Sequence, residues 1–157
     1  MSLKFAPGML IDTLDRTLGR TLGLAPVPAV SARDAVSPTA GTWRLPMLDD
    51  SGDEIGIVIA DTGAVVLLGG TLIMLPENSM REQVADGQPS PPVLEAYAEV
   101  VNVLRGVVNN TQRNPHVVPG QLEPGGAGAG WRVDPQTRLD LAAETPIGPI
   151  RLSFLSR

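Results

Sequence analysis

The segment over residues 92–110 carries the side chains that are best suited to chemistry in this chain. At about 100° per residue of α-helix, a small set of polar residues and one glycine falls within about 40° of a single line along the helix. The set is Glu95, Glu99, Asn102, Gly106 and Asn109. Val and Leu side chains cover most of the remaining surface, so the pattern predicts a largely buried helix with one narrow polar stripe.

Two residues of the stripe, Glu99 and Asn102, are three positions apart and are therefore neighbours on a helix. A carboxamide both donates and accepts hydrogen bonds, so Asn102 can orient a water molecule, and the Glu99 carboxylate can pair with a cationic side chain of a partner. Because phosphoryl transfer depends mainly on placement and charge stabilisation, such a pair can complete the active site of another protein. Gly106 leaves a bare patch one turn further along, where a partner can approach closely.

The stripe also has a simpler explanation. Every amphipathic helix needs a polar face, and Glu and Asn are ordinary residues on such a face. A Glu-x-x-Asn match of four residues is a weak signal by itself. Judged on the stripe alone, a solvated helix face is therefore the favoured interpretation.

Composition excludes several other kinds of site. The 157 residues suit one domain, and the absence of Cys together with a single His, His116, excludes a disulfide scaffold, a Cys nucleophile, a Cys-containing zinc site and a His pair. The net charge of −5, without any basic run, argues against a nucleic-acid partner. No apolar run approaches the roughly 20 residues of a membrane span, and no signal pattern is present, so we expect a cytoplasmic protein. We expect His116 and Trp131 to be structural.

Apolar periodicity predicts the other helices, on which the polar stripe depends for support. Leu recurs every four residues over residues 7–23, which predicts a helix that stops at Gly23. Residues 63–75 are apolar nearly throughout and predict a buried helix, although the Gly69-Gly70 pair weakens that assignment. A short helix is expected over residues 76–86.

Patterns typical of strands occur in the sequence between these helical segments and after the last of them. Residues 42–48 and 54–60 predict two strands, and Pro46 favours a position at a sheet edge for the first. The acidic residues 49–53 between them lack the spacing of a calcium loop and predict a simple turn. A further strand is predicted over residues 116–122.

The C-terminal residues predict a hairpin that must lie on an apolar surface. Polar and apolar residues alternate over residues 138–143 and 150–155, and the turn is expected at 146–149, so each strand has one apolar face. Residues 24–41 form a Pro-rich connector, and residues 124–130 form a Gly-rich loop without the G-x-G-x-x-G spacing of a phosphate cradle. The order of elements predicts an α+β fold in which an antiparallel sheet packs against helices on one face.

Residues 99–106 read Glu-Val-Val-Asn-Val-Leu-Arg-Gly and resemble the Glu-x-x-Asn-x-x-x-Gly helix of the CheC/CheX group of chemotaxis phosphatases. The order of helices, strands and closing hairpin is also the order expected of a CheX-like chain. A CheC-like chain would carry two such helices, and this sequence carries one. The resemblance implies a single CheX-like domain over residues 1–157, with the connector and the Gly-rich loop as additions.

The resemblance also implies a function and a set of partners. The family dephosphorylates the phospho-aspartate of the response regulator CheY, with Asn102 orienting the attacking water and Glu99 contacting a lysine of the regulator. Glu95, Gly106 and Asn109 would contact the partner. The Mg²⁺ ion would be held by the regulator, with no metal or cofactor of the chain's own, and the chain would form a homodimer.

Two alternatives remain open at the level of sequence. The first is a non-catalytic binding module of the same fold in a chemotaxis or flagellar assembly. The second is an unrelated small α+β structural protein whose polar stripe is only solvated. The agreement between the motif and the order of elements favours the family over the second alternative, and the presence of both Glu99 and Asn102 favours the aspartyl-phosphate phosphatase over the binding module.

Overall fold

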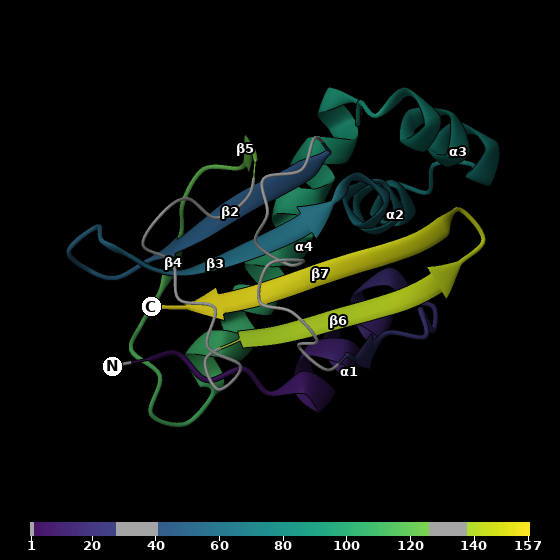
Figure 1. The fold of residues 1–157 in the computed structure, drawn as a ribbon. Coiled ribbons are helices and arrows are strands. Elements are labelled where there is room, and N and C mark those ends of the chain that lie inside the picture. The colour runs from purple at the N-terminus through teal and green to yellow at the C-terminus, as the bar shows by residue number, and fades with distance from the viewer. Residues whose placement is uncertain (1, 28–40, 126–137) are drawn as a thin grey trace.

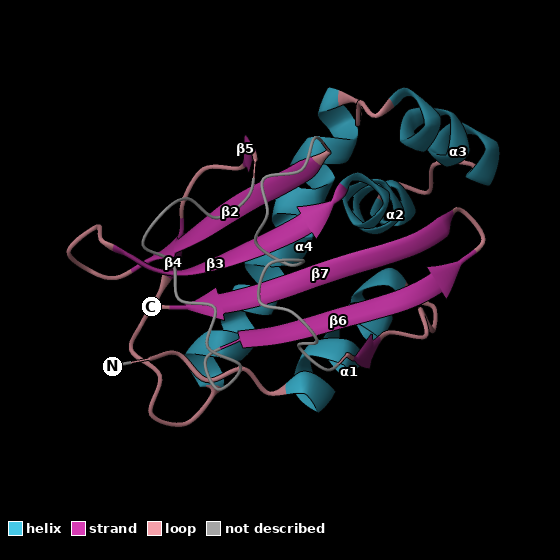
Figure 2. Ribbon diagram, viewed as in Figure 1, coloured by secondary structure: helices cyan, strands magenta, loops and turns pink. Residues whose placement is uncertain are grey.

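The computed structural model describes residues 2–27, 41–125 and 138–157. Within these ranges an antiparallel sheet has the strand order β1-β6-β7-β3-β2-β4, with β5 also paired to β2 (Figures 1 and 2). The helices are α1 (Pro7–Leu18), α2 (Thr62–Leu72), α3 (Glu77–Asp86) and α4 (Pro91–Asn110). The strands are β1 (Ala25–Pro26), β2 (Thr42–Leu48), β3 (Glu54–Asp61), β4 (Val118–Pro119), β5 (Glu123–Pro124), β6 (Arg138–Thr145) and β7 (Gly148–Ser156).

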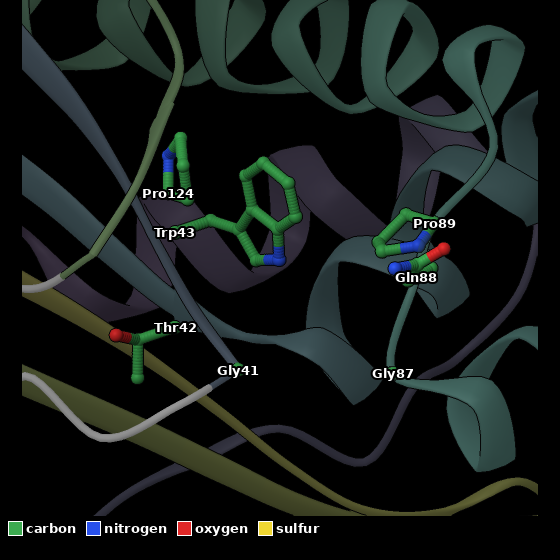
Figure 3. Close-up of a pocket in the computed structure, with 7 residues that line it drawn as sticks. All are labelled: Gly41, Thr42, Trp43, Gly87, Gln88, Pro89 and Pro124. Carbon is green, nitrogen blue, oxygen red and sulfur yellow. The ribbon is translucent and has the colours of Figure 1, made fainter.

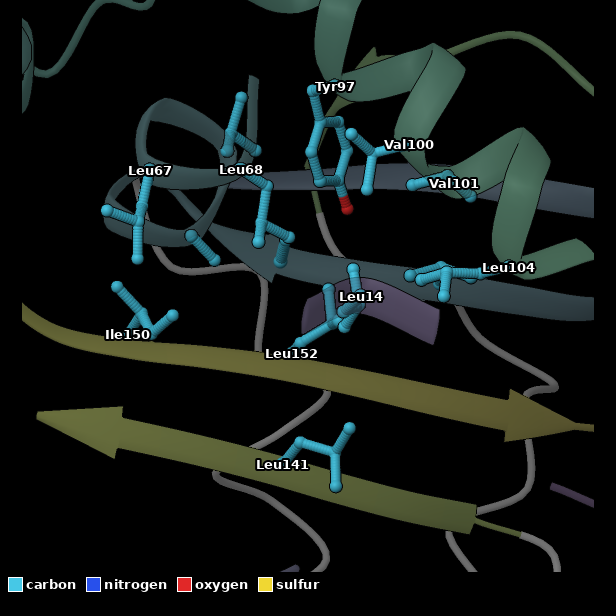
Figure 4. Packing of buried hydrophobic residues seen from close by; sticks show 14 of the residues in the cluster. Leu14, Leu67, Leu68, Tyr97, Val100, Val101, Leu104, Leu141, Ile150 and Leu152 are labelled. Carbon is cyan, nitrogen blue, oxygen red and sulfur yellow. The ribbon is translucent and has the colours of Figure 1, made fainter. Parts of the chain in front are cut away.

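Helices α1, α2 and α4 lie on one face of the sheet, so the predicted α+β architecture is confirmed (Figure 1). The side chains between the two layers are mainly leucine and valine. Figure 4 shows Leu68, Val100 and Leu104 of the helices facing Leu141 and Leu152 of β6 and β7. The helices therefore cover the apolar side of the C-terminal hairpin, as the alternation in the sequence predicted.

Helix α1 ends earlier than predicted. Gly19 has a left-handed φ of 69°, and its N–H donates to the carbonyl of Arg16 at 3.3 Å, so Gly19 rather than Gly23 terminates the helix. The Asp15 carboxylate then accepts a hydrogen bond from the Leu22 N–H at 3.0 Å. Leu22 consequently reaches the core from the loop after the helix, which is why the leucine spacing runs past the true helix end.

Helix α2 is the buried helix that residues 63–75 predicted, and its glycines have a packing role. A Cβ atom on Gly69 would collide with the carbonyl oxygen of Val93 on α4, and one on Gly70 would lie 2.7 Å from the sulfur of Met80 on α3. These two positions lower the intrinsic helix propensity but allow the neighbouring helices to approach closely. The helix ends at Leu72, before the predicted end at residue 75, and Met74 has a positive φ of 58°.

The second face of the hairpin is also buried, which corrects the prediction of one buried face per strand. Leu155 of β7 forms a second apolar cluster with Ile57 and Ile59 of β3. Asp140 of β6 lies on the same face and is buried, because it accepts hydrogen bonds from Arg138 Nε at 2.7 Å and from the Ser153 hydroxyl. Alternation identified the polar positions, and their mutual pairing allows them to be buried.

The edge of the sheet beside β2 is only partly paired. Met47 and Leu48 pair with β4, and Trp43 pairs with β5, so the strand predicted over residues 116–122 shortens to Val118–Pro119. The carbonyl of Pro46 accepts a hydrogen bond from the Gly120 N–H at 2.8 Å, on the side away from β3. The predicted edge position of Pro46 is therefore wrong for β2 as a whole, since β4 and β5 pair with this strand on the side away from β3. The proline fits because it lies between these two short pairings, where no N–H is needed for the ladder.

The remaining predictions concern loops and membrane spans. Residues 49–53 form a turn in which the Asp49 carboxylate accepts hydrogen bonds from the backbone N–H groups of Ser51 and Asp53, so the simple turn is confirmed. In the connector, Ala25–Pro26 pairs with β6, while residues 28–40 lie outside the described residues, as do residues 126–137 with most of the Gly-rich loop and Trp131. Across the described ranges, no helix has both the length and the apolar character that crossing a membrane requires.

Candidate functional site

Helix α4 has one buried side and one exposed side, as predicted. The buried side chains are apolar apart from the hydroxyl of Tyr97, and they comprise Val93, Ala96, Tyr97, Val100, Val101, Leu104 and Val108. The start of the helix is fixed by Ser90, whose N–H donates to Gln83 Oε1 at 2.9 Å and whose hydroxyl accepts from Gln83 Nε2 at 3.2 Å. The helix therefore presents its polar stripe on a rigid support.

Glu99 and Asn102 are both exposed on this helix. The Asn102 side chain has a defined partner, because its Oδ1 accepts a hydrogen bond from Arg105 Nε at 2.8 Å. The sequence analysis did not select Arg105, although its position three residues after Asn102 makes it a neighbour on the same side of the helix. A carboxylate, a carboxamide and a guanidinium, those of Glu99, Asn102 and Arg105, thus follow one another along this side of α4.

Asn109 is half-buried, and its carboxamide is used within the chain. Its Nδ2 donates to the carbonyl of Val117 at 3.0 Å, and its Oδ1 accepts from the Val117 N–H at 2.8 Å. The same carbonyl accepts from Arg105 Nη1 at 3.1 Å. The sequence predicted that Asn109 contacts a partner, whereas its described contacts hold the loop after α4 against the helix.

The other two stripe residues differ in their surroundings. Gly106 is half-buried, and a Cβ atom placed on it would meet no atom within 4 Å, so the packing of the chain does not require a glycine there. Glu95 is exposed at the rim of a shallow apolar hollow of about 230 Å³. The other residues that line this hollow are Trp43, Leu94, Ala98 and Leu122. The structure therefore brings Glu95, Glu99, Asn102 and Gly106 to one accessible side of α4.

A larger cavity of about 360 Å³ is also lined in part by Trp43 (Figure 3). Its lining residues are Gly41, Thr42, Trp43, Gly87, Gln88, Pro89 and Pro124. Figure 3 shows the indole ring between Pro124 and the loop that contains Gln88 and Pro89. Among the described residues of this lining there is no carboxylate, imidazole or cationic side chain, which are the usual groups of an acid–base site.

Burial perturbs the pKa values of two titratable groups in the interior. Burial raises the pKa of the Asp61 carboxyl, although hydrogen bonds from the backbone of Ala64 and Arg151 oppose the shift. Burial, and next the nearby Asp61 carboxylate, raise the pKa of the Tyr97 hydroxyl. Tyr97 lies on the buried side of α4 and Asp61 caps the start of α2, so neither group extends the exposed stripe.

The side chain of His116 contacts Asp50 rather than Glu99 or Asn102. Its Nδ1 is 2.8 Å from Asp50 Oδ1, and both side chains are exposed. In the described part of the chain, no group of three or more His, Cys, Asp or Glu side chains is arranged to hold a metal ion. Within the described residues, the exposed polar pair of α4 is therefore the candidate that we consider further.

Solved structures with the same arrangement of helices and strands identify the architecture. A CheC-like superfamily protein from Shewanella sp. PV-4 superposes with a TM-score of 0.58 at 9% identity, over 96% of this chain and 93% of that chain. The fold is that of the CheC and CheX chemotaxis proteins. CheX from Vibrio vulnificus gives a TM-score of 0.57 at 11% identity, over 96% and 95% of the two chains. A CheC-like chemotactic protein from Shewanella oneidensis MR-1 gives 0.56 at 13% identity, over 96% and 95%.

The resemblance found in residues 99–106 is thus confirmed at the level of the CheC/CheX-like fold. No family model matches the sequence, and no curated protein matches it either. Because identities of 9–13% relate the chains through their folds alone, the activity has to be argued from the side chains of α4.

Proposed function

We propose that this protein is a chemotaxis signalling protein that removes the phosphoryl group from the phospho-aspartate of a CheY-like response regulator. The observation that carries the proposal is the exposure of Glu99 and Asn102 on a helix that is otherwise anchored in the core of a CheC/CheX-like fold. An exposed pair on a rigid helix can enter a partner's active site without rearrangement of its own backbone.

In the proposed reaction, the Asn102 carboxamide orients a water molecule in line with the phosphorus atom. The water oxygen forms a bond to phosphorus while the bond between phosphorus and the aspartate oxygen breaks. The products are a free aspartate carboxylate on the regulator and inorganic phosphate, which takes up the oxygen and both protons of the water. Glu99 pairs with the ammonium group of a lysine beside the phosphoryl group, and that pairing sets the register of α4 on the regulator.

The proposal assigns the metal to the regulator. A Mg²⁺ ion beside the aspartyl phosphate would neutralise phosphoryl charge, and carboxylates of the regulator would hold it. The contribution of this chain is then limited to positioning the water and the partner. Glu95 and Gly106 flank the Glu99 and Asn102 pair on the exposed side of α4 and would lie within the same contact area.

A homodimer is proposed as the assembly, following the resemblance to CheX. Light scattering on a size-exclusion column tests it, with twice the monomer mass as the expected result. A monomer at the concentrations of the phosphatase assay would contradict the dimer and leave the catalytic proposal in place, because Glu99 and Asn102 come from one helix of one chain.

The experiment that tests the function follows the decay of a phosphorylated CheY-like regulator from the same organism. Wild-type protein is expected to accelerate the loss of phosphate, and Asn102→Ala is expected to abolish the acceleration while leaving the fold intact, because Asn102 is exposed. Val103→Ala is the matched control, since Val103 is 43% exposed on the next position of α4 and carries no polar group.

The outcomes of this assay also separate phosphatase from binding module. Equal decay rates with wild type and Asn102→Ala would contradict the catalytic role. Saturable binding of the phosphorylated regulator without any acceleration would instead indicate a non-catalytic module of a chemotaxis or flagellar assembly.

A further inference from the structure

We infer that Arg105 is a positioning residue, which holds the carboxamide of Asn102 in the orientation that the proposed hydrolysis requires. The inference rests on the proposed function, because it assigns a task within that reaction. Its starting point is the hydrogen bond of 2.8 Å from Arg105 Nε to Asn102 Oδ1. Arg105 would act through Asn102 and need not touch the phosphoryl group.

The chemistry of the two side chains fixes which end of the carboxamide faces Arg105. A guanidinium has only N–H donors, so the atom of Asn102 that it contacts must be the oxygen. Both N–H donors of Asn102 and the second lone pair of its oxygen then remain for other partners. A single water molecule can use one donor and that lone pair, which gives it a defined direction relative to the helix.

The Arg105 guanidinium is also hydrogen-bonded to the backbone of the loop after α4. Its Nη1 donates to the carbonyl of Val117 at 3.1 Å. Val117 is fully buried, and its N–H and carbonyl are both hydrogen-bonded to the side chain of Asn109. A continuous set of contacts therefore runs from the buried Val117 through Arg105 to the exposed Asn102.

This arrangement restricts the conformational freedom of an exposed catalytic side chain. An isolated Asn on a helix surface samples several rotamers and can present either end of its carboxamide to a water molecule. A charge-assisted hydrogen bond from a guanidinium that is itself hydrogen-bonded to the Val117 carbonyl restricts it to one orientation. Since a misplacement of about 1 Å can lower a catalysed rate about 100-fold, the restriction has a measurable consequence.

The first test uses the regulator decay assay over a range of protein concentrations. Arg105→Ala is expected to lower the maximal rate about 10- to 100-fold, with the half-saturating concentration changed less than about twofold. Arg105→Lys keeps the charge but lacks the planar fork that reaches both Asn102 and Val117, so its maximal rate is expected to fall about tenfold. Arg81→Ala is the matched control, because Arg81 is an exposed arginine on α3 that pairs with Glu77 of its own helix.

Asn109→Ala provides an indirect route to the same effect. It touches neither Asn102 nor the regulator in this scheme, and it removes the contacts that fix the Val117 carbonyl. Its maximal rate is expected to lie between those of wild type and Arg105→Ala. If Asn109→Ala keeps the wild-type rate while Arg105→Ala is slower, the inference that Val117 and Asn109 anchor Arg105 is wrong.

The second test does not depend on activity. The side-chain amide signals of Asn102 in ¹⁵N NMR spectra should be dispersed in the wild type and should move toward the values of free Asn in Arg105→Ala. Unchanged Asn102 signals, an unchanged maximal rate of Arg105→Ala, or a wild-type rate of Arg105→Lys would each overturn the inference while the phosphatase stands. A faster Arg105→Ala would overturn it as well, because the contact would then be inhibitory. A wild type that fails to accelerate decay at all would overturn the proposed function and this inference together.

Discussion

Gly69 of α2 packs against the carbonyl oxygen of Val93 on α4, so closely that a Cβ atom at residue 69 would overlap it. The two helices meet backbone to backbone at this point. Because α4 carries the exposed Glu99 and Asn102 pair on its opposite side, we expect this contact to set how far the pair stands from the core. A change in this contact should therefore lower both the free energy of unfolding and the rate in the decay assay.

Gly69→Ala is expected to lower the free energy of unfolding by about 1–3 kcal/mol, because the added methyl group overpacks a contact with rigid backbone. Urea unfolding at neutral pH measures this difference. Gly106→Ala on α4 is the matched control, since a Cβ atom there meets nothing within 4 Å and alanine favours a helix interior by about 1 kcal/mol. The pair of variants should therefore move stability in opposite directions, and equal effects would contradict the packing role of Gly69.

Glu99→Gln is expected to weaken docking rather than chemistry. Loss of a charge-assisted contact with a lysine of the regulator should raise the half-saturating concentration about tenfold, which corresponds to about 1.4 kcal/mol. The wild-type value should rise with added salt, and that dependence should be reduced in the variant, because screening acts on a charge that the variant lacks.

The control for this experiment is Glu82→Gln, which removes an exposed carboxylate from α3 and changes the net charge by the same amount. A salt dependence of Glu99→Gln equal to that of wild type would show that Glu99 does not pair with the regulator. A fall in the maximal rate without a change in half-saturation would place Glu99 in the chemical step instead.

Much of the fold could be predicted from the sequence because periodicity reports which side chains are buried. The limits of that approach are visible at particular residues. The leucine spacing could not distinguish Gly19 from Gly23 as the helix end, since Leu22 is buried in either case. Gly69 argued against a helix by propensity, and only the position of Val93 explains why it is there. Leu155 looked solvent-facing because its neighbours in the alternation are polar.

The candidate site was predictable to a similar extent. The stripe on α4 followed from helical geometry, and Glu99, Asn102 and Glu95 are exposed as that geometry required. The partners of Asn109 and Arg105 were not predictable, because both bind the backbone of Val117, and a sequence pattern does not show where a loop folds back onto a helix. Whether Glu99 and Asn102 perform chemistry stays a prediction for the assays described above.

Asp61 gives the stability of the fold a predictable dependence on pH. Burial raises its pKa above the ordinary value of 3.8, so the folded state binds this proton more tightly than the unfolded state does. Its contribution to stability is therefore fully present below pH 3.8 and is lost as the pH rises through the raised pKa of the folded state. Asp61→Asn should remove this loss while keeping the side-chain oxygen that caps α2 at Ala64.

Urea unfolding of wild type and Asp61→Asn across the acidic range measures the difference directly. The free energy of unfolding of Asp61→Asn, relative to that of wild type, should increase as the pH rises from about 4 toward neutrality. Asp61→Ala should show the same altered pH dependence. Its free energy of unfolding should be about 1 kcal/mol lower than that of Asp61→Asn at every pH, because the cap of α2 is removed. A constant difference between wild type and Asp61→Asn would contradict the raised pKa.

Gly106→Leu separates the packing of the chain from the approach of a partner. A Cβ atom at residue 106 meets nothing within 4 Å, so we expect a leucine side chain to extend outward without a loss of stability, and a thermal melt should show a midpoint no lower than that of wild type. If the regulator lies against α4 around the Glu99 and Asn102 pair, the same side chain would hold the two surfaces apart. The half-saturating concentration in the decay assay should then rise at least about tenfold, or about 1.4 kcal/mol. Gly106→Ala, with one added carbon, should show a smaller rise. Wild-type saturation by Gly106→Leu would mean that the partner does not approach this part of the helix, and the docking surface would have to lie nearer to Glu95.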